Sequence, residues 1–151
     1  MPKAKAHPDQ LGFVFVPPKA PAGEAALAGF EQRVNRMVGS MLNSDERPRE
    51  VIAAEMSVLL GEEVSRAMLD AYASPARVEH KVPFSRLIAL TLVTKRHDLL
   101  DERMREGGMA VLFGDEVKTA RLGDIKRRIA ALKQEERAIE RSSPVIRGNG
   151  S

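Results

Sequence analysis

The sequence predicts an all-α fold, in which a helical domain containing a helix-turn-helix is followed by a long C-terminal coiled-coil helix. Apolar residues recur at steps of three and four along most of the chain, which is the spacing of one face of a helix. Aromatic residues make up only 4% of the 151 residues, and tryptophan is absent. A core of Leu, Val, Ile, Met and Ala suits helix packing better than strand packing.

Four segments follow from the composition along the chain. Residues 1–21 are rich in Pro, Lys and Ala and lack a helical period, which predicts a flexible basic arm. Residues 22–110 carry the helical patterns expected of the domain, and residues 115–141 those of the coiled-coil helix. Residues 142–151 are expected to form a flexible tail.

Two helices are expected first. One begins at Ala22 and ends before Ser44, and the next has Pro48 in its first turn, where the missing N–H of proline costs nothing. Gly61 can adopt the left-handed conformation that ends the second helix near Leu60. The apolar positions expected to face inward are Leu27, Phe30, Val34, Met37, Val38 and Met41 in the first helix and Val51, Ile52, Met56, Leu59 and Leu60 in the second.

Three shorter helices complete the expected domain. Ser65 is a good N-cap for a helix from Arg66 to about Ala73, whose apolar positions include Leu69. Pro83 opens a helix that is apolar on nearly all sides, which is typical of the buried centre of a small domain. Its apolar residues are Phe84, Leu87, Ile88, Leu90, Leu92 and Val93. A last short helix over 98–105 is closed by two glycines.

The long C-terminal helix carries a heptad pattern. Apolar residues fall at alternating steps of three and four, with Glu136 the one polar residue among them. This pattern predicts homo-oligomerisation through a coiled coil, although packing of the helix against its own domain would give the same pattern. The predicted oligomerisation residues are Leu122, Ile125, Ile129, Leu132 and Ile139.

The segment 50–72 has the features of a helix-turn-helix. Such a motif needs a small residue where two helices cross, a turn residue with unusual dihedral angles, and a capped second helix with apolar anchors. Ala53 or Ala54, then Gly61, Val64, Ser65 and Leu69 meet these needs in order, although the turn is about two residues longer than in the tightest motifs.

The helix-turn-helix interpretation predicts a set of residues that contact double-stranded DNA. Arg66 would contact a guanine edge or a phosphate, and Ser65 a phosphate at the helix N-terminus. The alternative is that Arg66 and Asp70, four residues apart, form an ordinary surface ion pair. Ala71 is also expected on the outward side. The predicted DNA-binding residues are Ser65, Arg66, Ala67, Asp70, Ser74, Arg77 and Lys81.

The net charge of +3 is unevenly distributed. Residues 1–21 carry three lysines and one aspartate, residues 22–120 carry 13 basic and 16 acidic side chains, and residues 121–151 carry eight basic and four acidic ones. We therefore expect attraction to nucleic acid to depend on the ends of the chain and on a local face of the domain.

Several kinds of chemistry are not expected. Cysteine is absent, and His7, His80 and His97 lack the spacing of metal ligands, so neither a metal site nor a cofactor is predicted. No nucleotide-binding loop or catalytic triad has its local signature, and the protein is predicted not to be an enzyme. No apolar run approaches the length of a membrane span, which predicts a cytoplasmic protein.

A resemblance supports the DNA-binding interpretation. The residues from Pro48 to about Leu100, including LGEEVSRAMLDAYAS at 60–74, EHKVP at 79–83 and DLL at 98–100, resemble uncharacterised proteins of Mu-type transposable phages. They resemble more loosely the phage-repressor (Xre-type) helix-turn-helix domains. The resemblance covers roughly a third of the chain and implies a role in phage regulation or genome handling.

Three functional hypotheses result. The first is a phage or prophage transcriptional regulator that binds DNA as a dimer. The second is an oligomeric DNA-recognition subunit for genome packaging, similar to a small terminase subunit. The third is a protein-interaction module that has lost DNA binding, which the acidic excess of residues 22–120 and Asp70 would favour.

Overall fold

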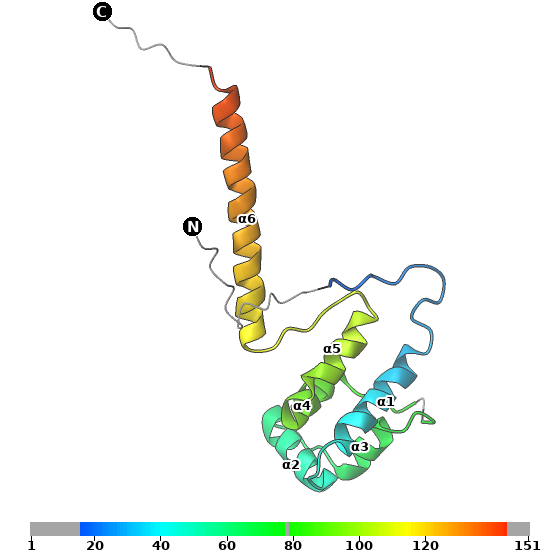
Figure 1. The fold of residues 1–151 in the computed structure, drawn as a ribbon. Coiled ribbons are helices and arrows are strands. Elements are labelled where there is room, and N and C mark those ends of the chain that lie inside the picture. Colours follow the sequence, from blue (N-terminus) through cyan, green and yellow to red (C-terminus); the bar gives the residue numbers. More distant parts are fainter. Residues whose placement is uncertain (1–15, 78, 145–151) are drawn as a thin grey trace, which may run out of the picture. The chain divides into compact units, whose positions relative to one another are not determined.

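The computed structural model describes residues 16–77 and 79–144, and within them it confirms an all-α fold of six helices without a strand (Figure 1). The helices are α1 (Phe30–Asn43), α2 (Arg49–Leu60), α3 (Arg66–Tyr72), α4 (Phe84–Thr94), α5 (His97–Arg105) and α6 (Asp115–Ser142). The chain divides into two compact units, residues 1–111 and residues 112–151. The first contains α1 to α5 and the second contains α6.

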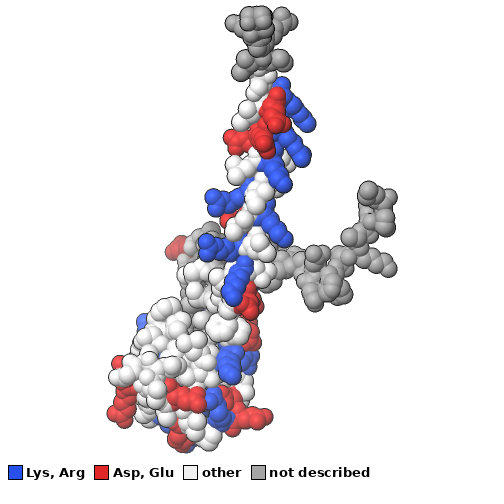
Figure 2. Space-filling model, turned by 90° about the vertical axis from the view of Figure 1, so that its left-hand side faces the viewer, with Lys and Arg blue, Asp and Glu red and all other residues white. Residues whose placement is uncertain are grey.

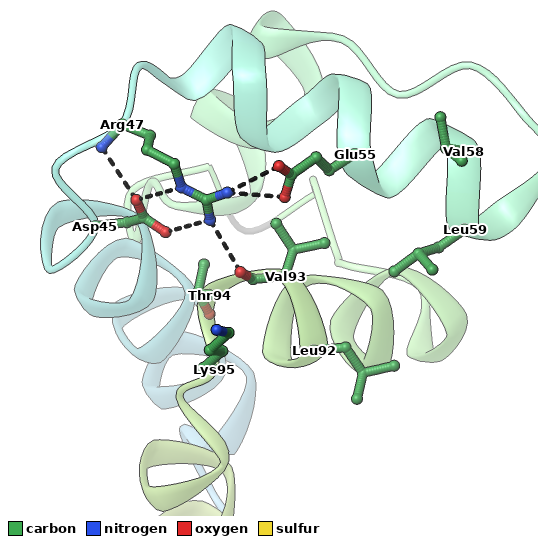
Figure 3. A pocket seen from close by; sticks show the side chains of 9 residues that line it. All are labelled: Asp45, Arg47, Glu55, Val58, Leu59, Leu92, Val93, Thr94 and Lys95. Carbon is green, nitrogen blue, oxygen red and sulfur yellow. Dashed lines mark hydrogen bonds and ion pairs between the residues drawn. The ribbon is translucent and has the colours of Figure 1, made fainter.

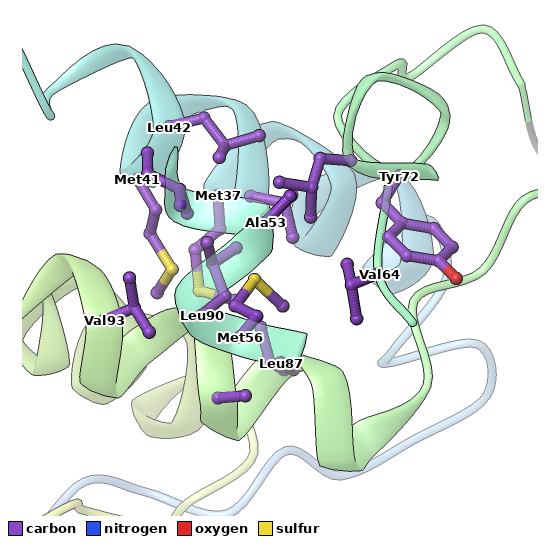
Figure 4. Close-up of a cluster of buried hydrophobic side chains, with 14 of the residues drawn as sticks. Met37, Met41, Leu42, Ala53, Met56, Val64, Tyr72, Leu87, Leu90 and Val93 are labelled. Atoms are coloured by element: carbon purple, nitrogen blue, oxygen red, sulfur yellow. The ribbon is translucent and has the colours of Figure 1, made fainter. Parts of the chain in front are cut away.

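The core of the first unit lies between α1, α2 and α4, with α3 and α5 packed at its sides. Figure 4 shows methionines from α1 and α2 interleaved with leucines of α4. Unbranched methionine side chains fill irregular gaps between helices, which suits a core without tryptophan. The largest side chains that are almost fully buried are Met41, Ile52, Met56, Leu69, Leu90 and Val38.

The first helix begins later than the sequence predicts. It starts at Phe30 and not at Ala22, and Leu27 is half exposed. The physical reason lies in the backbone, because Ala25 and Gly29 both adopt positive φ angles, of 53° and 72°. A residue in that region interrupts a right-handed helix, so the segment before Phe30 forms turns.

Two further expectations about burial were wrong. Val51 and Leu59 on α2 were expected to face inward, but they are 41% and 58% exposed. The helix α4 is buried on one face only, with Phe84 69% exposed and Leu92 47% exposed. These helices belong to a small unit in which each has neighbours on one side, so an apolar residue on the other side stays in contact with solvent.

A close approach fixes the N-terminal segment of the first unit. A Cβ atom added to Gly108 would lie 2.5 Å from the Cα atom of Ala20, so only glycine fits there. Gly108 also has a φ of 75°. Of the arm expected over residues 1–21, residues 1–15 lie outside the described part, as do residues 145–151 of the expected tail.

Candidate nucleic-acid interface

The connection between α2 and α3 is short and is bonded to the end of α2. Gly61 ends α2 with a φ of 65°, as the sequence predicts, and its N–H donates to the carbonyl of Ser57. The Ser57 hydroxyl accepts from the N–H of Val64 at 2.8 Å and lies 3.2 Å from the Val64 carbonyl. Because Val64 is buried, the chain is anchored to the core just before α3 begins.

Ser65 caps the N-terminus of α3, as the sequence predicts. Its Oγ accepts from the backbone N–H of Met68 at 3.2 Å, which satisfies one of the N–H groups that have no partner within the helix. Leu69, one turn later, is fully buried and anchors α3 in the core. The N-terminal turn of α3 is thereby fixed in position.

Polar contacts hold α3 from two other helices. Asn35 on α1 is buried, and its Nδ2 donates to the carbonyl of Ser74, just after α3, at 3.2 Å. Arg86 on α4 donates from Nη1 to the Tyr72 hydroxyl at 2.5 Å. The Arg86 guanidinium also lies 5.9 Å from the centre of the Tyr72 ring. Contacts from both α1 and α4 therefore help to fix the position of α3 in the domain.

The predicted DNA-binding residues in and beside α3 differ in exposure. Arg66 and Ala67 are exposed, while Ser65, Asp70 and Ser74 are partly buried. Ala71, which was expected on the outward side, is buried, with 7% of its surface exposed. Because α3 packs against both α1 and α2, its exposed strip is narrower than the sequence pattern suggests.

Arg66 is engaged by two carboxylates in this structure. Its Nη1 lies 2.6 Å from Oε1 of Glu50 on α2, and its Nε lies 3.6 Å from Oδ2 of Asp70. Asp70 is also bound by Arg49, whose Nη1 lies 2.5 Å from Oδ1. The surface ion pair of Arg66 and Asp70, the alternative considered from the sequence, is thus present, and Glu50 adds to it.

The electrostatics of this cluster, which we call the α3 charge cluster (Arg49, Glu50, Arg66 and Asp70), are balanced. The pKa of Glu50 lies below its usual value because its carboxylate accepts hydrogen bonds, first from its own backbone N–H and then from Arg66. The hydrogen bond to Glu50 raises the pKa of Arg66. Two cations and two anions leave no net charge, so this part of α3 does not present a positive surface.

Two of the cationic residues predicted to contact DNA lie outside the α3 charge cluster. Arg77 and Lys81, both in the loop between α3 and α4, are exposed. Their side chains form no ion pair with any residue in 16–77 or 79–144. The structure thus leaves both cations exposed, and their predicted contact with DNA stays a prediction.

A groove between α2 and α4 was not foreseen from the sequence. It has a volume of about 900 Å³, and the exposed side chains of Val58, Leu59 and Leu92 lie along it (Figure 3). At one end, Arg47 binds Asp45 and Glu55 and donates to the Val93 carbonyl at 2.9 Å. Little in the sequence indicates this groove, since Val93 lies 46 residues from Arg47.

The helix α6 exposes its whole predicted seam. None of its residues is buried, and the predicted oligomerisation residues range from 41% exposed at Ile125 to 63% at Leu132. Figure 2 shows Lys and Arg side chains along most of α6, with acidic side chains toward both of its ends. An amphipathic helix with an uncovered apolar stripe has the surface of a coiled-coil partner.

Two further features were sought among the described residues, a group of metal ligands and a membrane-spanning helix. No three or more His, Asp or Glu side chains are grouped there as metal ligands would be. None of the described helices combines the length and apolar character that crossing a membrane requires. Comparison with protein-family models, curated proteins and solved structures finds no match for the chain.

Proposed function

We propose that the protein binds double-stranded DNA through α3 and its following loop, and that α6 joins copies of the chain into a homo-oligomer. The observation that carries the proposal is the α2–α3 pair. Gly61 ends the first helix in a left-handed conformation, Ser65 caps the second, and Leu69 anchors it, while Arg66 and Ala67 remain exposed. These are features that a helix-turn-helix needs in order to present its second helix to a major groove.

The cations beside α3 fit contacts to the DNA backbone. Arg77 and Lys81 are exposed on the loop that follows α3, where phosphate contacts would orient the helix without reading sequence. Arg66 would contact DNA after exchanging Glu50 for a phosphate or a base edge. Such an exchange replaces one charge-assisted hydrogen bond of Arg66 by another and leaves the exposed Glu50 carboxylate to solvent.

The regulatory part of the proposal rests on the resemblance to proteins of transposable phages. A transcriptional regulator of a phage or prophage, in the cytoplasm of a bacterial host, would use two copies of α3 on one operator. A packaging subunit would use a ring of many copies with little sequence preference. The number of chains in the oligomer distinguishes these two roles.

A protein-interaction module is the second candidate, and the α3 charge cluster is the observation that favours it. Arg66 has two carboxylates within 3.6 Å, and an apolar groove lies between α2 and α4. A neutral surface of mixed charges suits a protein partner better than it suits DNA, because binding to DNA depends on cations that neutralise phosphates.

A binding titration with fluorescent duplexes separates the candidates. If α3 and its loop contact DNA, Arg66→Ala and the double variant Arg77→Ala/Lys81→Ala both weaken binding at least several-fold. The double variant also lowers the salt slope by roughly 0.9 for each phosphate that it no longer neutralises. Arg36→Ala, which removes an exposed arginine from α1, serves as the matched control. Unchanged affinity in both α3-region variants contradicts the proposed interface.

A further inference from the structure

We infer that α6 pairs with α6 of a second copy in an antiparallel orientation. This inference rests on the proposed oligomerisation and specifies its geometry. The seam of α6 is exposed throughout, and its flanking charges differ between the two halves of the helix. The orientation follows from asking which arrangement of two identical helices places opposite charges and apolar side chains together.

The a and d positions of the seam are symmetric about its centre, which allows an antiparallel register that matches all six of them. The heptad places Leu122, Ile129 and Glu136 at a positions and Ile125, Leu132 and Ile139 at d positions. An antiparallel pair aligns each a residue with a d residue of the second copy. The resulting layers join Leu122 to Ile139, Ile125 to Glu136, and Ile129 to Leu132, each twice.

The polar residue Glu136 disfavours a parallel pair of α6 helices. A hollow on α6 is lined by Leu132, Glu135, Glu136, Ile139 and Glu140. Four of these, at spacings of three, one and three, have the diamond pattern of a hole that receives a side chain from a partner helix. In a parallel pair that side chain is Glu136 of the second copy, whereas in the antiparallel register it is Ile125.

A parallel pair would also place like charges together along both flanks. Its interhelical pairs join a g position to the e position of the next heptad in the second copy. In this sequence all such pairs that flank the seam join residues of like charge and therefore repel. They are Arg121 with Lys126, Arg128 with Lys133, and Glu135 with Glu140, each twice.

The antiparallel pair brings a basic g position of one helix beside an acidic g position of the other. Arg128 then faces Glu135 of the second copy at g positions, an attraction that occurs twice. Lys126 faces Lys133 at e positions and repels, so the antiparallel pair balances attraction and repulsion where the parallel pair has repulsion alone.

The orientation determines where the first units lie in the dimer. In the antiparallel register the two Asp115 residues lie about 46 Å apart along the helix pair, at a rise of about 1.5 Å per residue. The two copies of α3 therefore belong to units that join the helix pair at opposite ends. In a parallel pair both units would join it at the same end.

Cysteine cross-linking tests the orientation directly, because the chain has no native cysteine. Leu122→Cys and Ile139→Cys are made separately in the full chain, oxidised alone, and oxidised after mixing and refolding together. The antiparallel register predicts a disulfide-linked dimer in the mixture only, since residue 122 lies about 25 Å from its own copy. Cross-linking of each variant alone, without preference for the mixture, would overturn the antiparallel orientation.

Charge variants give a second test in which the two orientations predict opposite signs. Arg128→Glu faces Glu135 in the antiparallel pair and weakens dimerisation by about tenfold, whereas it faces Lys133 in a parallel pair and strengthens it. Arg128→Glu/Glu135→Arg restores the antiparallel dimer. Arg127→Glu is the matched control, because Arg127 lies at an f position on the outside of the pair.

The mass of the unmodified protein in analytical ultracentrifugation separates the two levels of failure. A chain that is monomeric at every concentration contradicts the proposed oligomerisation itself. A dimer in which Arg128→Glu tightens association contradicts only the orientation. A dimer weakened by Arg128→Glu but not by Arg127→Glu supports both.

Discussion

Replacing Glu50 by glutamine is expected to strengthen DNA binding, because it releases Arg66 from its nearer carboxylate. The Glu50 Oε1 atom lies 2.6 Å from Arg66 Nη1, whereas the Asp70 contact to Nε is longer, at 3.6 Å. The substitution keeps the size of the side chain and a hydrogen-bond acceptor. It changes the net charge of the α3 charge cluster from zero to +1.

The size of the effect follows from phosphate binding. If the released Arg66 neutralises one further phosphate, the slope of log affinity against log salt steepens by roughly 0.9. Between about 50 and 200 mM salt, that single phosphate changes the affinity ratio of variant to wild type by roughly three- to fourfold. The increase in affinity is therefore largest at low salt and shrinks as salt rises.

Fluorescence anisotropy with a labelled duplex at several salt concentrations measures both quantities. Glu102→Gln makes the same change in net charge at an exposed, ion-paired position on α5 and controls for long-range attraction. On an Arg66→Ala background the effect of Glu50→Gln should fall to the level of that control. Equal effects of Glu50→Gln and Glu102→Gln, with and without Arg66, would refute an interaction between Arg66 and DNA.

Two further predictions concern stability. Hydrogen bonds from Arg47 lower the pKa of Asp45 from 3.8 to about 2. The ionised carboxylate therefore stabilises the fold above its ordinary pKa, and this stabilisation is lost as pH falls through about 2. It amounts to at most about 2 kcal/mol, since solvent at Arg47 screens the pair. Urea denaturation should show a steeper loss of stability for wild type than for Asp45→Asn over that range, and parallel curves would contradict it. Gly108→Ala should lower the free energy of unfolding more than Gly61→Ala does. Gly61 has a similar positive φ of 65°, but a Cβ atom added there would meet nothing within 4 Å. At both positions the strain of a positive φ in alanine costs about 1–3 kcal/mol, and only at Gly108 does the clash with Ala20 add to it. Equal losses of stability in urea denaturation would show that the residues near Ala20 move aside freely.

Local signals predicted much of the fold. Ser65 was identified as the N-cap of α3 and Gly61 as the C-cap of α2, because capping depends on side-chain chemistry and backbone freedom within a few residues. The order of the helices and most of the core followed from periodicity. The start of α1 did not, because an apolar spacing at Leu27 cannot reveal the positive φ of Gly29.

Features that depend on how helices cross were harder to predict. Arg66 and Glu50 are 16 residues apart, and their ion pair exists only because α3 packs against α2. The groove beside Arg47 depends likewise on α2 and α4 leaving Leu59 and Leu92 uncovered. Periodicity identifies an apolar face but does not say how much of it a small domain can bury.

Light scattering coupled to size exclusion tests most directly whether α6 joins two chains that together bind DNA. The full chain is run at about 100 mM salt, alone and with a mixture of short duplexes, since affinity depends on salt. We expect the mass of two chains for the protein alone and a larger mass with duplex. A species that stays at the mass of one chain and does not increase in mass with any duplex, even at low salt, would contradict both parts of the proposed function.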